Sequence, residues 1–426
     1  MTGQYFQPGV AEPQIFEDLS GVIGGLRAAQ PSLVAASNDD LLELLADFGG
    51  RLLRDPATMR LDGVVFLAAW LKRANLEGML ELNLGGREAA LEGFIPLGEG
   101  ARGTRIAARP HGLVSMWMAG NVPTLAAFSF IPALLARNVC LVKLADPEAG
   151  MDRILDVLAR SEGPGVSGRE LADCVGVVWY SSEERDLSVE MSRAADAKVV
   201  WGGRGAIEGV RALPQADHCV NIDFGPKYSI GMIDAGIQQD SEQLDAAVAA
   251  FVRDIAIFDQ RACSSPQTIF VERGELSLAD VGDRFAAAFS KLPPKPDLDA
   301  YTTVQIVNTR AQWALDEVRD VIASADGANW TVCMDQEVSL KEAIQSRTVF
   351  LSAVDSSEHV IPLISPRVQT VGIAFGDPDK AAAFAAAATL KGAVRCVRPG
   401  LMNVQESPWD GKLLINQLVR WVTLKP

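Results

Sequence analysis

The stretch that decides the fold is GLVSMWMAGNVPTLAAFSFIPALLARNVCLVKLA, residues 112–145. Apolar runs at 112–119 and 139–145 have the length of buried strands, and the segment 124–138 between them has the length of a helix. Two strands joined by a helix form a βαβ unit with parallel strands. Up to its first arginine the stretch carries no charge, but the GNVP turn and Pro132 interrupt any continuous spanning helix, so we expect no membrane span here.

The alternation of strands and helices continues after this unit. The predicted strands lie at 174–180, 197–203 and 228–234, and the predicted helices lie at 151–161, 183–195 and 206–213. Such alternation predicts an open, mostly parallel sheet, which binds nucleotides at the carboxyl ends of its strands. Residues 1–100 are predicted to be rich in helix and carry no obvious chemistry.

A second α/β region begins near Asp240. A helix predicted over 241–259 places apolar residues from Leu244 to Phe258 on one face, with Ser241 as its N-terminal cap. Further strands are predicted at 267–272, 348–354 and 370–376, and further helices at 311–324 and 379–392. The sequence therefore predicts an α/β protein with two open, mostly parallel α/β domains.

Composition narrows the class of protein. The chain has 426 residues, of which 48% are hydrophobic, and a formal net charge of −15. A chain this acidic, without a cluster of Lys or Arg, is not expected to bind nucleic acid or an anionic membrane. Six scattered cysteines and three separated histidines predict neither a disulfide framework nor a metal site. The N-terminus lacks the basic and apolar segments of a signal peptide, so we expect a soluble, cytoplasmic protein without membrane insertion.

Cys263 is the candidate nucleophile. It lies in FDQRACSSPQ (258–267), a polar loop after a predicted helix, whereas most other cysteines lie in apolar runs. From the residues alone this thiol fits either a nucleophile or a small buried side chain, since a lowered pKa is not visible in a sequence. The glycines of WGGRGAIEG (201–209) follow a predicted strand and open a helix, which fits a dinucleotide-binding turn or an ordinary turn.

Four stretches, in this order, resemble the aldehyde dehydrogenase superfamily. They are GNVPTLAAFSFIPALLARNVCLVKLADPE, VVWGGRGAIEGV, NIDFGPKYSIGMID and DQRACSSPQTIFVE. Within the superfamily, DQRACSSPQ, SPRVQTVGI (365–373) and PWDGKLLINQLVRWV (408–422) are similar to the LuxC-type acyl-CoA reductases, the fatty acid reductases of bacterial bioluminescence and their relatives. The resemblance runs from about residue 110 to the C-terminus and implies an aldehyde-dehydrogenase-like fold with its active site between two domains.

This resemblance implies reduction of an acyl-CoA, or another acyl thioester, to the aldehyde with release of CoA. NADPH or NADH would be the cofactor. Cys263 would attack the thioester carbonyl and carry the acyl group, and Asn121 would hold the oxyanion together with the backbone N–H of Cys263.

The cofactor residues are carried over from the same resemblance. Lys143 would reach the adenosine ribose or its 2′-phosphate, and Trp201, Gly202 and Gly203 form the cofactor turn, where glycine permits close backbone approach. Asp146 lies where a carboxylate would accept ribose hydroxyls and repel a 2′-phosphate. We therefore expect NADH to be used at least as well as NADPH, although the resemblance implies NADPH as the usual cofactor of the family.

The sequence departs from the superfamily at two further positions. Asp223, the third predicted catalytic residue, stands where aldehyde-oxidising members carry a general-base Glu, and its shorter side chain suits a reaction that activates no water. The glutamate that binds the nicotinamide ribose in the superfamily is replaced in this sequence, near Pro362. The implied domains are 1–239, an N-terminal helical segment with the NAD(P)-binding domain; 240–398, the catalytic domain; and 399–426, a segment that packs back on the cofactor domain or on a partner subunit.

Three other functions remain open at this stage. One is NAD(P)-dependent oxidation of an aldehyde to the acid or acyl-CoA. Another is a Cys-dependent acyltransferase or thioesterase without nicotinamide, and the third is an assembly subunit with an unreactive Cys263. The motifs do not distinguish long-chain, short-chain and aryl acyl groups, and the superfamily resemblance implies a homo-oligomer, a dimer or tetramer.

Overall fold

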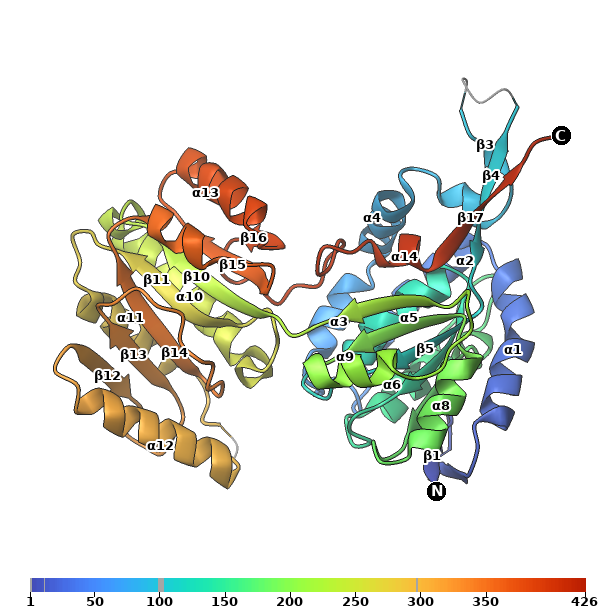
Figure 1. Cartoon of the computed structure of the whole chain (residues 1–426), viewed down its shortest axis with the longest axis horizontal. Helices are drawn as coiled ribbons and strands as arrows, with labels where there is room; N and C mark the ends of the chain where they lie inside the picture. Colours follow the sequence, from blue (N-terminus) through green and yellow to red (C-terminus); the bar gives the residue numbers. More distant parts are fainter. Residues whose placement is uncertain (1, 11, 99–102, 296–297) are drawn as a thin grey trace. The chain divides into compact units, whose positions relative to one another are not determined.

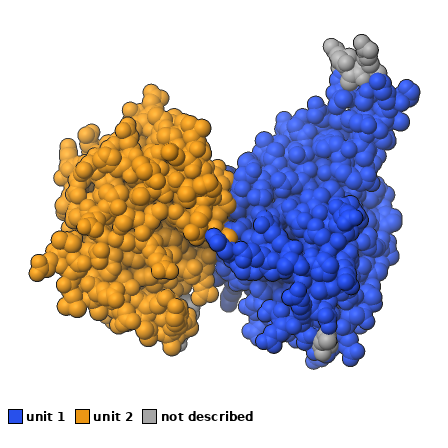
Figure 2. Space-filling view, in the orientation of Figure 1, with its two compact units in different colours: residues 1–225, 405–426 blue, residues 226–404 orange. Residues whose placement is uncertain are grey.

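Two sheets, one in each of two units, form the framework of the chain (Figures 1 and 2). The computed structural model describes residues 2–10, 12–98, 103–295 and 298–426. Unit 1 comprises Met1–Gly225 and Gln405–Pro426, and unit 2 comprises Pro226–Val404. The chain therefore passes through unit 2 once and returns to unit 1 before its C-terminus.

The sheet of unit 1 is a doubly wound parallel sheet. Its strand order over the described residues is β2-β1-β7-β6-β5-β8-β9, and β5 to β9 are parallel. These five strands are β5 (Leu113–Trp117), β6 (Val139–Lys143), β7 (Val175–Trp179), β8 (Ala197–Trp201) and β9 (Val220–Phe224). The predicted βαβ unit is confirmed, because α5 (Leu125–Leu135) joins β5 to its parallel neighbour β6. All of β5 is buried, as expected for a strand covered on both faces.

Helices pack on both faces of this sheet (Figure 1). The helices in contact with its strands are α5 together with α1 (Ser20–Ala35), α7 (Gly168–Ala172), α8 (Arg185–Ala194) and α9 (Arg204–Arg211). Helices α2 (Asn38–Leu52), α3 (Val64–Trp70), α4 (Arg73–Leu84) and α6 (Met151–Ala159), with the short η1 (Glu88–Leu91), contact one another or these helices. The fully buried Arg137 ties the N-terminal helices to the sheet. Its guanidinium donates to the Ala36 carbonyl at 3.1 Å and to Asn38 Oδ1 at 2.7 Å. The helices predicted in the first hundred residues thus share the core of unit 1.

Antiparallel pairs complete unit 1. The hairpin of β1 and β2 extends the parallel sheet beyond β7, and the C-terminal strand β17 pairs with β4, which pairs with β3. Their bounds are β1 (Gly3–Phe6), β2 (Gln14–Phe16), β3 (Ile95–Pro96), β4 (Arg105–Pro110), α14 (Leu414–Gln417) and β17 (Val419–Leu424). The last residues of the chain are therefore part of the first unit.

The sheet of unit 2 has the order β12-β13-β14-β11-β10-β15-β16 over the described residues, with only the edge strand β12 antiparallel. Its elements are β10 (Tyr228–Ile233), η3 (Ile237–Gln239), α10 (Ser241–Ala256), η4 (Ile257–Gln260), β11 (Pro266–Glu272), α11 (Leu278–Phe289), α12 (Ala300–Ala314), β12 (Arg319–Ala323), β13 (Thr331–Asp335), β14 (Thr348–Val354), η5 (Ser357–Leu363), β15 (Val368–Ala374), α13 (Pro378–Leu390) and β16 (Arg395–Val397). A Cβ added at Gly372 would lie 2.6 Å from the ring of Phe251, so this glycine permits α10 to pack closely on the strands.

Several local predictions for unit 2 were wrong. The strand predicted at 228–234 exists as β10, but it lies in the middle of the second sheet instead of ending the first α/β region. The cap of α10 is Asp240, whose carboxylate accepts the backbone N–H groups of Glu242 and Gln243, and not Ser241. The helix predicted over 311–324 ends at Ala314, because the β-branched residues that follow pair with β13 as the edge strand β12.

The charge-free part of the first quoted stretch forms a strand, a turn and a short helix. Pro132 lies inside α5, where the backbone N–H of Ala136 still donates to its carbonyl at 3.0 Å. In the described part of the chain, no helix combines the length and the apolar character needed to cross a bilayer.

Candidate active site

The carboxyl edge of the first sheet has a topological switch point between β5 and β8. The chain proceeds outward from β5 through β6 to β7, and from β8 to β9 in the opposite direction. Ligands of open α/β sheets bind outside the strand ends at such a point. The predicted residue Asn121 lies exposed in the loop after β5, and the predicted Gly202 directly follows β8. The structure thus brings both residues to the switch point.

Lys143 is the last residue of β6, the strand next to β5. Its half-buried ammonium lies 4.9 Å from the ring centroid of Tyr180 and donates to the Leu144 carbonyl at 3.4 Å. Burial lowers the pKa of Lys143 from its ordinary value. Asp146 follows in the same loop, exposed, with Oδ1 accepting the backbone N–H of Glu148 at 2.9 Å. A cation and a carboxylate therefore both extend from the end of β6.

The ends of β8 and β9 form an aromatic platform. The rings of Trp201 and Phe224 stack with their centroids 3.8 Å apart and an interplanar angle of 2°. The ammonium of Lys412, from the C-terminal segment, lies 5.3 Å from the centroid of Phe224. Trp201 is buried, and its Nε1 finds no hydrogen-bond acceptor among the residues that the structure describes. A buried donor without an acceptor is costly, so a ligand or a water at this edge would stabilise it.

The two glycines after β8 have different surroundings. A Cβ on Gly202 would lie 2.9 Å from the Cβ of Ala206, so this glycine is needed for the turn into α9. A Cβ on Gly203 would meet no atom within 4 Å. Gly203 is thus not required by the protein's own packing, and its open side is available for a ligand to approach the backbone.

Asp223 is engaged by an arginine. It lies on β9 with its carboxylate largely buried, and Arg211 of α9 donates to its Oδ2 from Nε at 2.6 Å and from Nη2 at 2.5 Å. The other oxygen, Oδ1, is buried without a hydrogen-bond donor in the described chain. The carboxylate is therefore held against α9 by a charge-assisted contact.

The Cys263 loop begins with a left-handed turn. The predicted helix over 241–259 was too long, because α10 ends at Ala256 and Phe258, Asp259 and Gln260 have φ angles of 54°, 49° and 65°. Such angles cost about 1–2 kcal/mol for each residue other than glycine. Phe258 is consequently not part of the apolar face of α10. The turn redirects the chain so that half-buried Cys263 lies just before β11.

Gln260 holds this turn through its buried side chain. Its Nε2 donates to the carbonyls of Pro266 at 2.9 Å and Thr348 at 3.0 Å, and its Oε1 accepts the backbone N–H of Thr348 at 2.9 Å. Pro266 and Thr348 are the first residues of β11 and β14. Gln260 therefore connects the nucleophile loop to the amino ends of two neighbouring strands.

A second left-handed turn supports the first. Gln345, Ser346 and Arg347 have φ angles of 66°, 54° and 56°. The backbone N–H of Ser346 donates to the Asp259 carbonyl at 3.0 Å, and its hydroxyl donates to Asp259 Oδ2 at 2.9 Å. Lys295 adds an ion pair with Asp259 Oδ1 at 3.0 Å. Each turn thus provides hydrogen-bond partners for the other, and these contacts stabilise the strained backbone of both.

The C-terminal side of the Cys263 loop is held by Asn403. Ser264 donates its hydroxyl to Asn403 Oδ1 at 2.7 Å, and Asn403 Nδ2 donates to the Asp254 carbonyl at 2.8 Å. Asp254 in turn accepts the backbone N–H of Gly400 at 2.5 Å through Oδ2. These buried contacts connect α10, the nucleophile loop and the segment that returns to unit 1. The sequence analysis missed Asp254 and Asn403, because no local pattern relates positions 254, 264 and 403.

Four of the remaining thiols, Cys140, Cys174, Cys219 and Cys333, are buried, and Cys396 is half-buried. Desolvation raises the pKa of Cys174 and Cys333 to about 12 and that of Cys396 to about 11, and it raises the pKa of Cys140 and Cys219 as well. These thiols stay protonated at neutral pH and are poor nucleophiles. Across the described ranges, no three His, Cys, Asp or Glu side chains gather as a metal site requires.

The predicted site residues form two groups. The cofactor residues Lys143, Asp146, Trp201, Gly202 and Gly203 share the carboxyl edge of the first sheet with Asn121, and Asp223 lies on β9 of the same sheet. Cys263 belongs to unit 2. Of the three predicted catalytic residues, Asn121 and Asp223 therefore belong to unit 1 and Cys263 belongs to unit 2.

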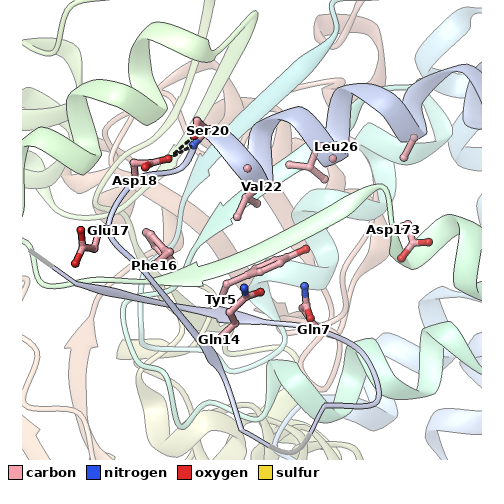
Figure 3. A pocket seen from close by; sticks show the side chains of 13 residues that line it. Tyr5, Gln7, Gln14, Phe16, Glu17, Asp18, Ser20, Val22, Leu26 and Asp173 are labelled. Atoms are coloured by element: carbon pink, nitrogen blue, oxygen red, sulfur yellow. Dashed lines mark hydrogen bonds between the residues drawn. The ribbon is translucent and has the colours of Figure 1, made fainter.

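A separate hollow of about 780 Å³ lies between the β1–β2 hairpin and α1 (Figure 3). Tyr5, Gln7 and Gln14 extend from the hairpin toward the helix, and Asp18 accepts the backbone N–H of Ser20 at the helix start. None of the predicted site residues lines this hollow. We therefore assign it no part in the chemistry.

Comparisons with known proteins identify the family. The acyl-CoA reductase (LuxC) family profile matches residues 41–421. The long-chain acyl-protein thioester reductase of Aliivibrio fischeri is 26% identical over 300 residues, which cover 66% of this chain and 57% of that protein. The protein of the same name from Photobacterium phosphoreum is 25% identical over 374 residues, which cover 82% of this chain and 69% of that protein. This chain thus spans less than two thirds of the first relative.

Solved structures agree on the fold. An NAD-dependent benzaldehyde dehydrogenase from Corynebacterium glutamicum superposes with a TM-score of 0.65 at 16% identity, covering 100% of this chain and 95% of that chain. The fold is therefore that of the aldehyde dehydrogenases, as the quoted motifs predicted. The chain belongs to the acyl-CoA reductase (LuxC) family.

The buried carboxyl of Asp254 gives a testable pH dependence. Desolvation raises its pKa to about 6 from an ordinary 3.8, so folding favours the protonated form. The contribution of Asp254 to the free energy of unfolding is therefore greatest below pH 4. It falls as pH rises through about 6, by about 3 kcal/mol at most. Asp254→Asn removes the titration and retains an acceptor for Gly400. We expect urea unfolding at a series of pH values to show wild type losing stability relative to the variant between pH 4 and 7. Parallel curves would contradict this assignment.

Proposed function

We propose that the protein reduces an acyl thioester to the aldehyde with a nicotinamide cofactor, through an acyl group carried on Cys263. The observation that carries the proposal is the nucleophile loop, in which a half-buried cysteine follows a strained turn that is fixed on both sides. Membership of an acyl-CoA reductase family supports the same reaction. The names of the curated relatives support acyl-protein thioesters as substrates beside acyl-CoA.

In the first step, the Sγ of Cys263 forms a bond to the acyl carbon, and the bond between that carbon and the thiol of CoA or of the carrier protein breaks. The leaving group departs as a thiolate and takes up a proton. The acyl carbon then accepts hydride, and the resulting thiohemiacetal collapses by breaking its bond to Sγ. One acyl thioester, one reduced nicotinamide and one proton thus give one aldehyde, one thiol and one oxidised nicotinamide.

The negative oxygen formed in both steps needs donors. In the proposal, the side-chain amide of Asn121 and the backbone N–H of Cys263 provide them. Removal of one such donor typically costs about 10²–10³ in rate. Ser229 supports the second donor, because its hydroxyl donates to the Cys263 carbonyl at 2.7 Å and accepts the backbone N–H of Thr370 at 3.1 Å. These contacts fix the peptide group that follows Cys263.

The carboxyl edge of unit 1 fits a dinucleotide. Gly203 leaves open space where any other residue has a Cβ, and the buried Nε1 of Trp201 lacks an acceptor in the described chain. When bound, the cofactor supplies hydride. Lys143 would contact its adenosine ribose, and Asp146 would accept the ribose hydroxyls.

The ion pair between Asp223 and Arg211 supports reduction over aldehyde oxidation to an acid. A general base has to contact the water that it activates, whereas the Oδ2 of Asp223 is occupied by two contacts with the guanidinium of Arg211. In a reaction that hydrolyses no acyl-enzyme, Asp223 needs only to hold α9 in place.

The first experiment follows the absorbance of NADH and NADPH with purified protein and a series of acyl-CoAs and acyl-protein thioesters. Wild type should consume reduced nicotinamide only when a thioester is present, and Cys263→Ala should consume none. Cofactor binding by the variant, measured by tryptophan fluorescence, should match that of wild type. The loss of activity is then a loss of the chemical step and not of cofactor binding. Consumption of NAD⁺ or NADP⁺ with a free aldehyde and no thioester reduction would support the oxidising alternative instead. Thioester cleavage without nicotinamide would indicate an acyltransferase or thioesterase.

The two glycines after β8 provide a matched pair of variants. Gly203→Ala adds a methyl group that meets no protein atom, so its melting temperature should equal that of wild type while its affinity for nicotinamide cofactor falls by about tenfold. Gly202→Ala should instead destabilise the fold by about 1–3 kcal/mol through the contact with Ala206. Titration calorimetry and thermal unfolding separate the two effects. Unchanged cofactor affinity in Gly203→Ala would place the dinucleotide elsewhere.

Asp146 tests the choice between the two cofactors. We propose that its carboxylate repels a 2′-phosphate, so NADH should bind at least as well as NADPH. Asp146→Asn removes the negative charge and should improve NADPH affinity by roughly tenfold, which corresponds to about 1.4 kcal/mol. Dissociation constants for both cofactors with both proteins provide the measurement. A large preference of wild type for NADPH would be incompatible with this role of Asp146.

A further inference from the structure

Lys412 is a cation that the C-terminal segment brings to the carboxyl edge of the first sheet. The segment turns back on itself there, because the backbone N–H groups of Trp409 and Lys412 donate to each other's carbonyls at 3.2 and 2.9 Å. Asp410 and Gly411 between them have φ angles of 50° and 72°, which is the left-handed geometry of a two-residue turn. The turn therefore fixes the backbone from which the lysine side chain extends.

The ammonium of Lys412 lies over one ring of the aromatic platform. Its Nζ is 5.3 Å from the centroid of Phe224, whose ring stacks on that of Trp201. Lys412 is half-buried, and among the residues that the structure describes no carboxylate forms an ion pair with it. An ammonium against an aromatic face is attracted by the ring but keeps its full charge. Lys412 therefore places a positive charge without an ion-pair partner at the ends of β8 and β9.

Lys143 and Lys412 stand three strands apart on this edge. Lys143 ends β6, and Lys412 contacts the ring that ends β9, with β5 and β8 between them. Since neighbouring strands lie about 4.8 Å apart, three spacings amount to about 14 Å, which suits two nucleosides joined by a pyrophosphate. In the proposed function, the adenosine ribose lies at Lys143 and Asp146. The nicotinamide end then reaches the ends of β8 and β9, where the Nε1 of Trp201 lacks an acceptor in the described chain.

We propose that Lys412 selects the reduced form of the nicotinamide cofactor over the oxidised form. This inference rests on the proposed function and names how the same site distinguishes the two forms. The nicotinamide ring is neutral when reduced and carries one positive charge when oxidised, and the remainder of the dinucleotide is identical. An ammonium held near that ring therefore weakens binding of the oxidised form through like-charge repulsion and leaves the neutral ring unaffected.

The aromatic platform alone has the opposite preference. The face of an aromatic ring attracts a cation, so an uncovered Phe224 would favour the positively charged, oxidised nicotinamide. Lys412 already lies over that face. The lysine thus replaces an attraction for the oxidised form by a repulsion. Its removal should consequently change the ratio of the two affinities and not only their size.

Selection of this kind serves the loading of the cofactor and its release. A reductase binds the reduced form in the presence of the oxidised form, which is also its own product. By thermodynamic linkage, a contact that stabilises the bound reduced form relative to the oxidised form makes the bound cofactor a weaker hydride donor by the same factor. We therefore assign Lys412 to cofactor exchange and not to the hydride step.

The test measures dissociation constants for NAD⁺ and NADH by titration calorimetry with the full chain. Lys412→Gln removes the charge, so NAD⁺ should bind about five- to tenfold more tightly, while the affinity for NADH changes by less than about twofold. Lys412→Arg retains the charge and should retain the wild-type ratio. Lys425→Gln is the matched control, because it removes one exposed charge from the same C-terminal segment and should leave the ratio unchanged. Melting temperatures show whether each variant is folded.

The ratio of the two dissociation constants decides the inference. An unchanged ratio in Lys412→Gln would overturn it, whether both affinities fall together, as for a lysine that contacts only phosphate, or neither changes. An equal shift of the ratio in Lys425→Gln would also overturn it, since the effect would then come from the net charge of the chain. A wild-type protein that binds neither form would refute the proposed function itself, and this inference with it.

Discussion

The arrangement of the candidate nucleophile depends on the buried amide of Gln260. Three consecutive residues in the left-handed region would be unstable in a free loop, at about 1–2 kcal/mol each. The Gln260 amide offsets this cost with donors and an acceptor that satisfy backbone groups of Pro266 and Thr348. The loop thereby gains one conformation in which Cys263 follows the turn at a fixed distance from the sheet. An acyl carbon must meet its nucleophile and its oxyanion donors together, so a single loop conformation is a precondition for such chemistry.

In the proposed function, unit 1 meets a different constraint, because an acidic chain would have to bind an anionic dinucleotide. Its net charge of −15 gives no general attraction, so the cations have to be local. Lys143 and Lys412 both lie against aromatic rings at the carboxyl edge of the sheet, at 4.9 and 5.3 Å from the centroids. The rings fix the position of each ammonium without neutralising it. Lys412 comes from the C-terminal segment, so the last part of the chain contributes to this edge of unit 1.

The parallel strands of the first sheet were predictable from the sequence, because each buried strand is a short apolar run and each helix between strands shows the apolar spacing of a helix. Asn121, Lys143 and Gly202 could be located for the same reason, since each lies at the end of such a strand or in the loop after it. Gln260 and Asn403 illustrate what the sequence does not reveal. Their roles come from contacts with residues up to 149 positions away, as between Asn403 and Asp254, and from left-handed backbone angles that no local preference of Phe, Asp or Gln indicates. Tertiary hydrogen bonds override local propensity at these positions.

The wrong helix boundary near residue 315 lies among exposed apolar residues. Apolar periodicity predicts a helix on the assumption that apolar residues face the core of their own chain. Leu315 and Val318 are 85% and 62% exposed, so they do not belong to that core, and the chain continues beyond them as the edge strand β12. Natural selection acts on the protein in its working state, so an apolar residue can owe its place in the sequence to burial in an assembly as well as in the single chain. An apolar position that misleads the prediction for a single chain is therefore informative about a surface that the single chain leaves uncovered.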